Sequence, residues 1–429
     1  MLNKIAMILV VVMIGSANAA EMSDAASERW REWRTSQKEF PLAAWSYFQH
    51  YAGTVSEYKM YRDAGLNYVQ APEAQAKNAQ AAGLGLVLGA FRDVHESEED
   101  LAALVEFSNA HPEGAVAYSL KDEPVPENYP ALAKSMAYIY ENDTTGALPI
   151  IDFRPNWAVP YKRWKMTYES CFESYVDEVA PPVLLHCHYP LMRDGSNREI
   201  YFSNLEYFRH ISLKKDIGLM GFVQITAHTF ENSTYIDYRA PSESDLNWLV
   251  NGHLAYGAQG LWYYNWRIKD KRFSDGIVSG ANGTPTMLYP KVKKVNERVT
   301  AMGDTLMKLK SNMVVHTDEV VPVGTTRYAQ GTIAGIHDWE GDSFIVSEFY
   351  NQDDPADKAV YLMIVNKLHA ANKASDNLMQ SCSFDIYPDY PNVSIFDPET
   401  LEFSDMNLND GHVSLKLGGG QAAFLILKP

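Results

Sequence analysis

Two adjacent acidic residues, Asp122 and Glu123, follow a short apolar run and are followed at once by Pro124. The run over residues 116–120 has the length of a buried strand, and a helical pattern begins soon after the proline. At the C-terminal end of a strand in a (β/α)8 barrel, such carboxyl groups are placed for catalysis. One of them, kept protonated, can give its proton to a leaving oxygen, as glycoside hydrolysis requires. A surface loop carrying two solvated acids is the alternative.

Other polar and aromatic residues gather where the neighbouring strands are predicted to end. We expect Glu123 to be the general acid, because the charge of Asp122 and partial burial would keep it protonated. The second carboxyl group would be Asp122, Asp152 or a strand-seven loop acid, Glu231 or Asp237. The predicted substrate-binding residues are Trp45, His50, Arg92, Arg154, His188, Tyr189, Gln224, Arg239, Tyr264 and Trp266. Four of these would stack on sugar rings: Trp45, Tyr189, Tyr264 and Trp266.

The elements that must position these residues can be predicted from the hydrophobic pattern. Apolar runs cover residues 41–50, 67–71, 85–91, 116–120, 148–152, 182–186, 219–225 and 260–266. They alternate with helical spacing over residues 56–64, 73–82, 98–110, 131–141, 168–176, 202–213, 243–256 and 291–309. Eight such units predict parallel strands that close into a TIM barrel over residues 40–310. A doubly wound open sheet is the alternative, but the usual glycine-rich loop does not follow the first strand.

The pattern changes after residue 311. Short alternating runs appear at residues 332–336, 344–349, 360–365, 382–386, 393–396 and 422–427, with no long helical segment. This predicts a C-terminal antiparallel β-sandwich over residues 311–429. The expected fold is therefore α/β, a (β/α)8 barrel followed by a β-sandwich that serves as an accessory domain.

The first nineteen residues have the features of a secretory signal peptide. Lys4 precedes an apolar run over residues 5–14, and Ala17, Asn18 and Ala19 form a small-residue cleavage site. We expect a secreted or periplasmic protein, since no later stretch reaches the ~20 apolar residues of a membrane helix. A net charge of −17 argues against nucleic acid and anionic membranes as partners. We expect a monomer.

Three cysteines, Cys171, Cys187 and Cys382, are too few for a disulfide framework. The sequence leaves two alternatives. Either one disulfide forms, with Cys171 and Cys187 the pair closer in sequence, or all three cysteines are buried thiols. His186 and His188 alternate with Cys187 on one strand, and we expect only one of them to face the cleft. We therefore predict no metal and no cofactor.

Several segments resemble a known family. The sequence Asp122-Glu123-Pro124 resembles the Asn-Glu-Pro that ends strand four in clan A glycoside hydrolases. Residues 238–241, 243, 254–264, 283–286 and 296 look like the corresponding loop, helix and strand of family 42-like (β-galactosidase-like) barrels. The resemblance implies a polysaccharide or oligosaccharide substrate and an acid/base role for Glu123. It breaks at strand seven, where Gln224 stands in place of the nucleophilic Glu, and at strand six, where Cys187 stands in place of an acid.

Five cations fall in or beside the predicted C-terminal loops: Arg92, Lys121, Arg154, Arg193 and Arg239. Because guanidinium groups bind sulfate and carboxylate with two hydrogen bonds, they indicate an anionic glycan, sulfated or uronate-bearing. The alternative is internal ion pairing with Asp93, Asp122, Asp152 and Asp194. Overall we predict a secreted glycoside hydrolase. A polysaccharide lyase and a non-catalytic glycan-binding protein on a degenerate barrel are the alternatives.

Overall fold

A computed structural model of the chain describes residues 19–46, 48–89, 97–158, 164–229, 237–408 and 410–429. Arg92, Asp93 and Glu231 lie outside these residues, as does the proposed signal peptide up to residue 18.

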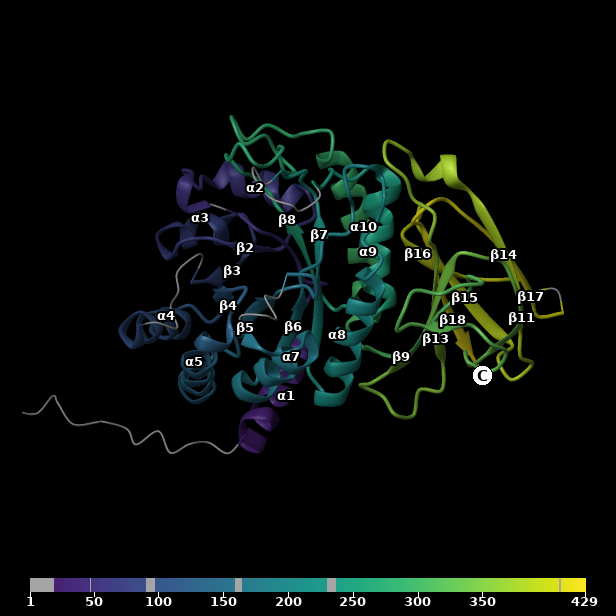
Figure 1. Cartoon of the computed structure of the whole chain (residues 1–429), viewed down its shortest axis with the longest axis horizontal. Coiled ribbons are helices and arrows are strands. Elements are labelled where there is room, and N and C mark those ends of the chain that lie inside the picture. Colours follow the sequence, from purple (N-terminus) through teal and green to yellow (C-terminus); the bar gives the residue numbers. More distant parts are fainter. Residues whose placement is uncertain (1–18, 47, 90–96, 159–163, 230–236, 409) are drawn as a thin grey trace, which may run out of the picture.

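The first part of the chain forms a closed barrel of eight parallel strands in sequential order (Figure 1). The strands are β1 (Leu42–Ala44), β2 (Tyr68–Gln70), β3 (Gly85–Leu88), β4 (Ala115–Asp122), β5 (Leu148–Phe153), β6 (Val183–His186), β7 (Gly218–Gln224) and β8 (Leu261–Tyr264). The barrel closes where Leu42 of β1 is the register partner of Leu261 of β8. The predicted fold class and all eight strands are confirmed.

Helices follow the strands and cover the outside of the barrel. They are α2 (Val55–Asp63), α3 (Ala76–Ala81), α4 (Glu98–Ala110), α5 (Tyr129–Asn142), α7 (Tyr168–Val179), α8 (Tyr201–Lys215), α9 (Glu243–Ala255) and α10 (Tyr289–Leu306). Thr54 and Ser242 begin α2 and α9 with capping boxes, which satisfy backbone N–H groups of the first turn. Gly65 and Gly257, with φ of +83° and +88°, stand just after the ends of the same two helices.

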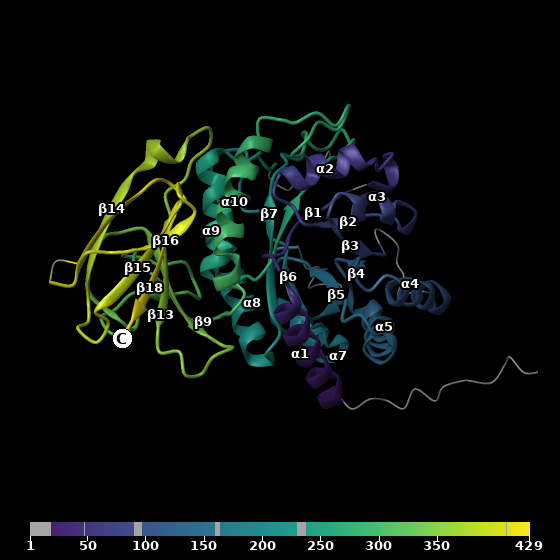
Figure 2. The ribbon, with the colours of Figure 1, turned by 180° about the vertical axis from the view of Figure 1, so that it is seen from behind.

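A helix that the hydrophobic pattern did not predict, α1 (Ala19–Ser36), closes the bottom of the barrel. Trp30 and Trp33 from this helix belong to the same apolar cluster as Ala117, Met220 and Trp262 from the strands. Trp33 also donates an indole hydrogen bond to the Val116 carbonyl oxygen, at 2.8 Å. Figures 1 and 2 place α1 at the end of the barrel opposite the loop that follows β8. In a barrel of this kind, the other end, where the strands finish, is the end that can carry a functional site.

The C-terminal part consists of two sheets. The larger has the order β10-β9-β12-β13-β18-β15-β16, and the smaller has the order β11-β14-β17. Their strands are β9 (Leu309–His316), β10 (Thr326–Arg327), β11 (Ile336–Glu340), β12 (Phe344–Asn351), β13 (Val360–Asn366), β14 (Gln380–Ile386), β15 (Asn392–Asp397), β16 (Glu402–Asp405), β17 (His412–Leu417) and β18 (Ala422–Lys428). The strand predicted over residues 332–336 is wrong, because β11 only begins at Ile336. Strands β9, β10, β16 and β17 were not predicted.

The central strands of the larger sheet, β12, β13 and β18, are buried on both faces. One face packs on the smaller sheet through a cluster that includes Leu362, Phe384 and Leu425. The other face contributes Met363 and Phe424 to the main core of the barrel helices. Barrel and sandwich therefore share one continuous core, which Figure 1 shows as the contact between the larger sheet and helices α9 and α10.

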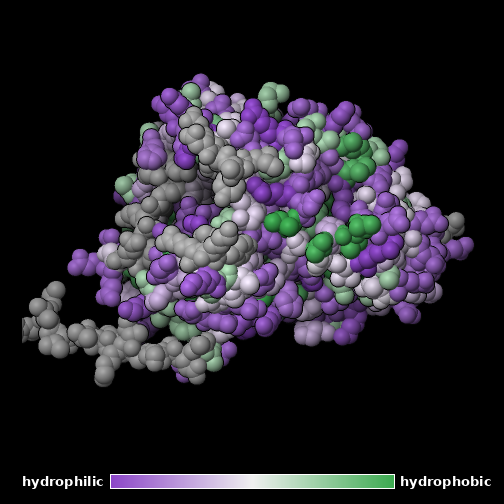
Figure 3. All heavy atoms as spheres, in the orientation of Figure 1, coloured by the Kyte–Doolittle hydropathy of each residue, from purple (hydrophilic) through white to green (hydrophobic). Residues whose placement is uncertain are grey.

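The visible surface is mostly hydrophilic, and the three cysteines decide between the two alternatives that the sequence left open. Hydrophilic residues cover most of the face shown in Figure 3, as a chain of net charge −17 requires. Within the described residues, no helix combines the length and apolar character needed to cross a bilayer. All three cysteines are buried free thiols, so the bridge between Cys171 and Cys187 is not formed.

Candidate active site

A pair of carboxyl groups joins the ends of β4 and β5. Asp122 and Asp152 are register partners on the two strands. Asp152 is 5% exposed, whereas Asp122 is exposed. Burial, followed by the negative charges of Asp122 and Glu123, raises the pKa of Asp152 well above its usual value, and Asp152 is hydrogen bonded to Asp122. Burial therefore favours the protonated form of Asp152.

Glu123 sits beside this pair in an uncommon backbone conformation. Its φ is +46°, in the left-handed region that non-glycine residues rarely adopt. Arg154 Nε lies 3.4 Å from Glu123 Oε2 and donates a hydrogen bond to the Glu123 carbonyl oxygen at 3.2 Å. The Glu123 side chain keeps 39% of its surface exposed, so it can reach a ligand.

The pKa of Glu123 results from three opposing effects. Burial raises it most, the positive charge of Arg154 lowers it, and the charge of Asp122 raises it. The net result is a pKa above the ordinary value. A carboxyl group with a raised pKa and an exposed edge is suited to donate a proton.

The end of β6 supplies uncharged groups next to the carboxyl cluster. The Cys187 thiol donates a hydrogen bond to the Tyr189 hydroxyl, at 3.5 Å. Burial, and then the charges of Asp152 and Glu123, raise the pKa of Cys187 well above its usual value. Burial also raises the pKa of Tyr189 well above its usual value. Both residues therefore stay neutral, and Cys187 is not a thiolate nucleophile.

An aromatic cluster continues from Tyr189 to the ends of β7 and β8. The ring centroid of Tyr189 lies 5.4 Å from that of Tyr264 and 5.8 Å from that of His228. His228 in turn stacks on Tyr238 at 4.1 Å and lies 5.3 Å from Phe273. His228 and Tyr238 are buried, so they support the half-buried rings of Tyr189 and Tyr264 and do not themselves offer a face to a ligand.

A groove of about 650 Å³ opens beside Tyr264, on loops that follow β1 and β8. His50, predicted as a binding residue, lies in this groove and is exposed. The groove also contains cations that the sequence reasoning missed, namely Arg267, Lys269 and Arg272.

These cations differ in their partners. Arg267 lies over the Tyr51 ring, 3.9 Å from its centroid, and 3.4 Å from Glu57. Arg272 pairs with Asp270 at 2.7 Å, and Lys269 is exposed. The groove therefore carries more positive than negative side chains in a protein that is acidic overall.

Three predicted sugar-binding residues are buried away from the opening, and this part of the prediction is corrected. Trp45 packs against Phe222, with ring centroids 5.9 Å apart. Trp266 is 2% exposed and packs edge-on against Tyr61. In this structure neither indole offers a free face on which a sugar could stack.

His188 is the third. It is fully buried, and its Nδ1 lies 3.1 Å from the Asn204 side-chain oxygen on α8. His186 points the same way, with its Nδ1 3.2 Å from His253 Nε2 on α9. The expectation that one of the two histidines faces the cleft is wrong, because residues two apart share a side of the chain.

The side-chain amide of Gln224 makes its hydrogen bonds with backbone atoms. Its amide oxygen accepts a hydrogen bond from Leu191 N–H at 2.9 Å, and its amide nitrogen donates to the carbonyl oxygens of Leu191 and Arg239, at 3.1 and 2.8 Å. The residue is 1% exposed. Gln224 therefore fixes the loops after β6 and β7, and its buried amide offers no open side to a ligand.

Arg239 and Arg193 form internal ion pairs, which was the alternative to binding an anionic glycan. Their partners differ from the aspartates that were predicted. Arg239 makes a two-fold ion pair with the buried carboxylate of Asp245, which His369 Nδ1 also contacts at 2.6 Å. Arg193 pairs with Asp237 at 2.6 Å. Arg239 is therefore held by Asp245 of α9, and it is Asp245 that links α9 to the sandwich through His369.

Comparison with known proteins identifies the fold. No protein-family profile and no curated protein sequence matches the chain. A family 5 glycoside hydrolase from Bacteroides vulgatus matches 91% of this chain and 89% of its own, with 13% identity and a TM-score of 0.52. Another structure titled glycoside hydrolase matches 91% and 92%, with 12% identity and a TM-score of 0.51. The chain shares its fold with glycoside hydrolases.

A β-galactosidase from the psychrophilic Marinomonas ef1 is also similar, over 63% of this chain and 62% of that one, with 9% identity and a TM-score of 0.46. The chain therefore spans less than two thirds of that enzyme. The resemblance to clan A and to family 42-like barrels stays a prediction.

Proposed function

We propose that the protein is a glycoside hydrolase that acts on a polysaccharide. The observation that carries this proposal is the carboxyl cluster of Asp122, Glu123 and Asp152 at the C-terminal ends of β4 and β5. Two of the three have a raised pKa, and Glu123 also has an exposed edge. These are the properties of a general acid at the catalytic end of a barrel.

In the proposed mechanism, Glu123 gives its proton to the oxygen of the leaving sugar. Asp122, exposed beside it, raises the pKa of Glu123 through its charge, and the base that takes a proton from the attacking water lies on the opposite face of the sugar. Asp152 holds the orientation of Asp122 through their hydrogen bond. Because Gln224 stands where a nucleophilic carboxylate would be needed, we propose direct displacement by water with inversion at the anomeric carbon. Proton NMR of the first product anomer measures this directly.

We further propose an anionic glycan as the substrate class, sulfated or uronate-bearing. The support is the groove at Tyr264, where Arg267, Lys269 and Arg272 outnumber Asp270. The Tyr264 and Phe273 rings lie in the same groove and offer apolar faces to sugar rings. Guanidinium and ammonium groups would hold the sulfate or carboxylate substituents.

A panel of sulfated, uronate-bearing and neutral polysaccharides, read by the release of reducing ends, tests the function. The Glu123→Gln variant keeps the side-chain volume and removes the proton that is donated. It should lose activity by about 100-fold or more, whereas Glu141→Gln, an exposed acid on α5, should not. Release of reducing ends by Glu123→Gln at the wild-type rate would contradict the proposal. Products that absorb ultraviolet light through a new conjugated double bond would indicate a lyase.

A non-catalytic glycan-binding protein is the second candidate, and Gln224 is the observation that favours it. In that case the wild type and Glu123→Gln both bind glycan and neither releases reducing ends. We also propose that the protein is exported, based on the signal-like residues 1–19, and that it is a monomer. N-terminal sequencing of the exported protein should then begin at Ala20, and sedimentation should give the mass of one chain.

A further inference from the structure

Three side chains form a row across the smaller sheet of the sandwich. His337 on β11 is the register partner of Asp385 on β14, and Asp385 is the register partner of His412 on β17. Directly opposed residues of an antiparallel pair project from the same face. The neighbours Phe384 and Val413 point into the sandwich core, so the row lies on the outer face of the sheet.

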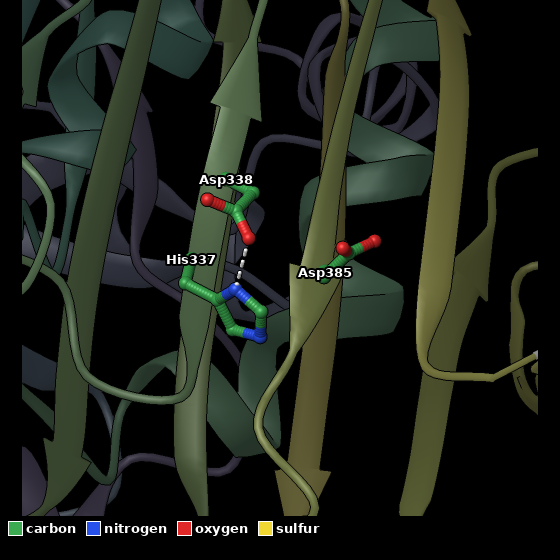
Figure 4. A group of neighbouring side chains, drawn as sticks. All are labelled: His337, Asp338 and Asp385. Carbon is green, nitrogen blue, oxygen red and sulfur yellow. Dashed lines mark hydrogen bonds and ion pairs between the residues drawn. The ribbon is translucent and has the colours of Figure 1, made fainter.

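A fourth side chain joins the row because β11 is irregular. The register of β11 shifts between His337 and Glu340, and Asp338 has a left-handed φ of +50°. This places the Asp338 carboxylate 2.6 Å from His337 Nδ1. Figure 4 shows the two side chains pointing toward each other. Ligand atoms of His337, Asp338 and Asp385 all lie within 4.8 Å of one another, and no other such group of three occurs among the described residues.

We propose that His337, Asp338 and Asp385 bind a divalent transition-metal ion such as zinc. Zinc lies about 2.0–2.2 Å from imidazole nitrogen and carboxylate oxygen, so its ligand atoms are separated by roughly 3–4 Å. Small rotations of these accessible side chains produce that separation. The two carboxylates balance the charge of the ion, and water completes its coordination. The imidazole selects against calcium and magnesium, which prefer oxygen ligands.

Two neighbouring residues hold the ligands in place. The Tyr387 ring packs against His337, with centroids 4.5 Å apart. His412 Nδ1 lies 2.7 Å from Asp385 Oδ1, and its Nε2 lies 3.1 Å from Ser414. His412 is therefore a positioning residue for Asp385, in the way that hydrogen-bonded partners orient metal ligands. The ion would tie β11 to β14 in a sheet that shares no strand pairing with the larger one.

The experiment uses the whole chain, freed of metal with a chelator and titrated with zinc chloride by isothermal calorimetry. We expect one zinc ion per chain and a melting temperature raised by ~2 °C or more at saturating zinc. His337→Ala and Asp385→Asn should each weaken binding at least ~10-fold, and His412→Ala should weaken it by about 10–100-fold. His210→Ala, which removes an exposed histidine of α8, is the matched control and should bind as the wild type does.

The four variants change accessible side chains, and circular dichroism verifies that each is folded. The proposal is overturned if the wild type binds less than one zinc ion per chain. It is also overturned if His337→Ala and Asp385→Asn bind zinc as tightly as His210→Ala. Saturation with magnesium or calcium at the same concentration as zinc would contradict the assignment to a transition metal.

Discussion

Asp122 and Asp152 face each other at the ends of β4 and β5, and a hydrogen bond joins their carboxyl groups. Asp152 is buried and Asp122 is exposed, and burial raises the pKa of Asp152. The exposed Asp122 lies on the side that substrate and water can reach. The charge of Asp122 also raises the pKa of Glu123.

The raised pKa of Asp152 predicts how stability depends on pH. The unfolded chain releases this proton near pH 4, whereas the folded protein keeps it to a higher pH. The free energy of unfolding should therefore fall as pH rises above about 4, by at most about 1.4 kcal/mol per pH unit from this group. Asp152→Asn removes this dependence and keeps a hydrogen-bond donor to Asp122.

Chemical unfolding at pH 4.5 and pH 8 measures the effect. Asp152→Asn should be more stable than the wild type at pH 8, and the difference should shrink at pH 4.5. Asp376→Asn, at an exposed aspartate, should follow the wild type at both values. A variant that is less stable at pH 8 would show that Asp152 is ionised in the folded protein.

The ion pair between Arg154 and Glu123 predicts a shift of the pH–activity profile. The Arg154 charge lowers the pKa of Glu123, so Arg154→Met should raise it. Because a general acid must be protonated to act, the alkaline limb of kcat/KM should move to higher pH. Arg193→Met, which removes a loop cation paired with Asp237, should leave that limb in place. An unmoved limb in Arg154→Met would remove Glu123 from the acid role.

The sequence predicted the barrel well because two kinds of signal agreed. Apolar runs marked the strands, and Gly65 and Gly257 marked the ends of helices. It was harder to predict whether a residue at the end of a strand points into the barrel or outward, because a shift of one residue reverses the direction. His188 and Tyr189 illustrate this. In the structure the Tyr189 ring packs against Tyr264, whereas His188, the residue before it, points outward to Asn204 on α8.

Other features of the structure could not be predicted, because the local sequence pattern does not indicate them. The groove cations Arg267, Lys269 and Arg272 lie in an irregular loop, and only the fold brings them near His50. The row of His337, Asp385 and His412 comes from three strands that are far apart in the sequence and adjacent only through tertiary pairing. Helix α1 is rich in charged residues, and its two buried tryptophans become a core feature only when the barrel is present.

The position of α1 predicts that the bottom of the barrel depends on Trp30. The Trp30 ring lies so close to β7 that a Cβ at Gly218 would come within 2.6 Å of it. Trp30→Ala should lower the free energy of unfolding by about 3–5 kcal/mol, through lost burial and the cavity left behind. Trp30→Phe, which keeps an aromatic ring, should lose less. Guanidinium unfolding measures both, and a loss under ~1 kcal/mol in Trp30→Ala would show that α1 does not close the barrel.

The hydrogen bonds of Gln224 predict the result of restoring a carboxylate at the end of β7. In Gln224→Glu, an oxygen would replace the amide nitrogen that donates to the carbonyl oxygens of Leu191 and Arg239. Two buried acceptors would lose their donor, so the variant should be less stable by about 2–4 kcal/mol and should gain no activity.

Gln224→Met removes the same hydrogen bonds without adding a charge and is the matched control for stability. Thermal unfolding and the reducing-end assay are measured on both variants. If Gln224→Glu instead gained hydrolysis with retention of configuration, the end of β7 would be a lost nucleophile position. Direct displacement by water would then be the wrong mechanism, because a retaining reaction needs that carboxylate on the opposite side of the sugar from Glu123.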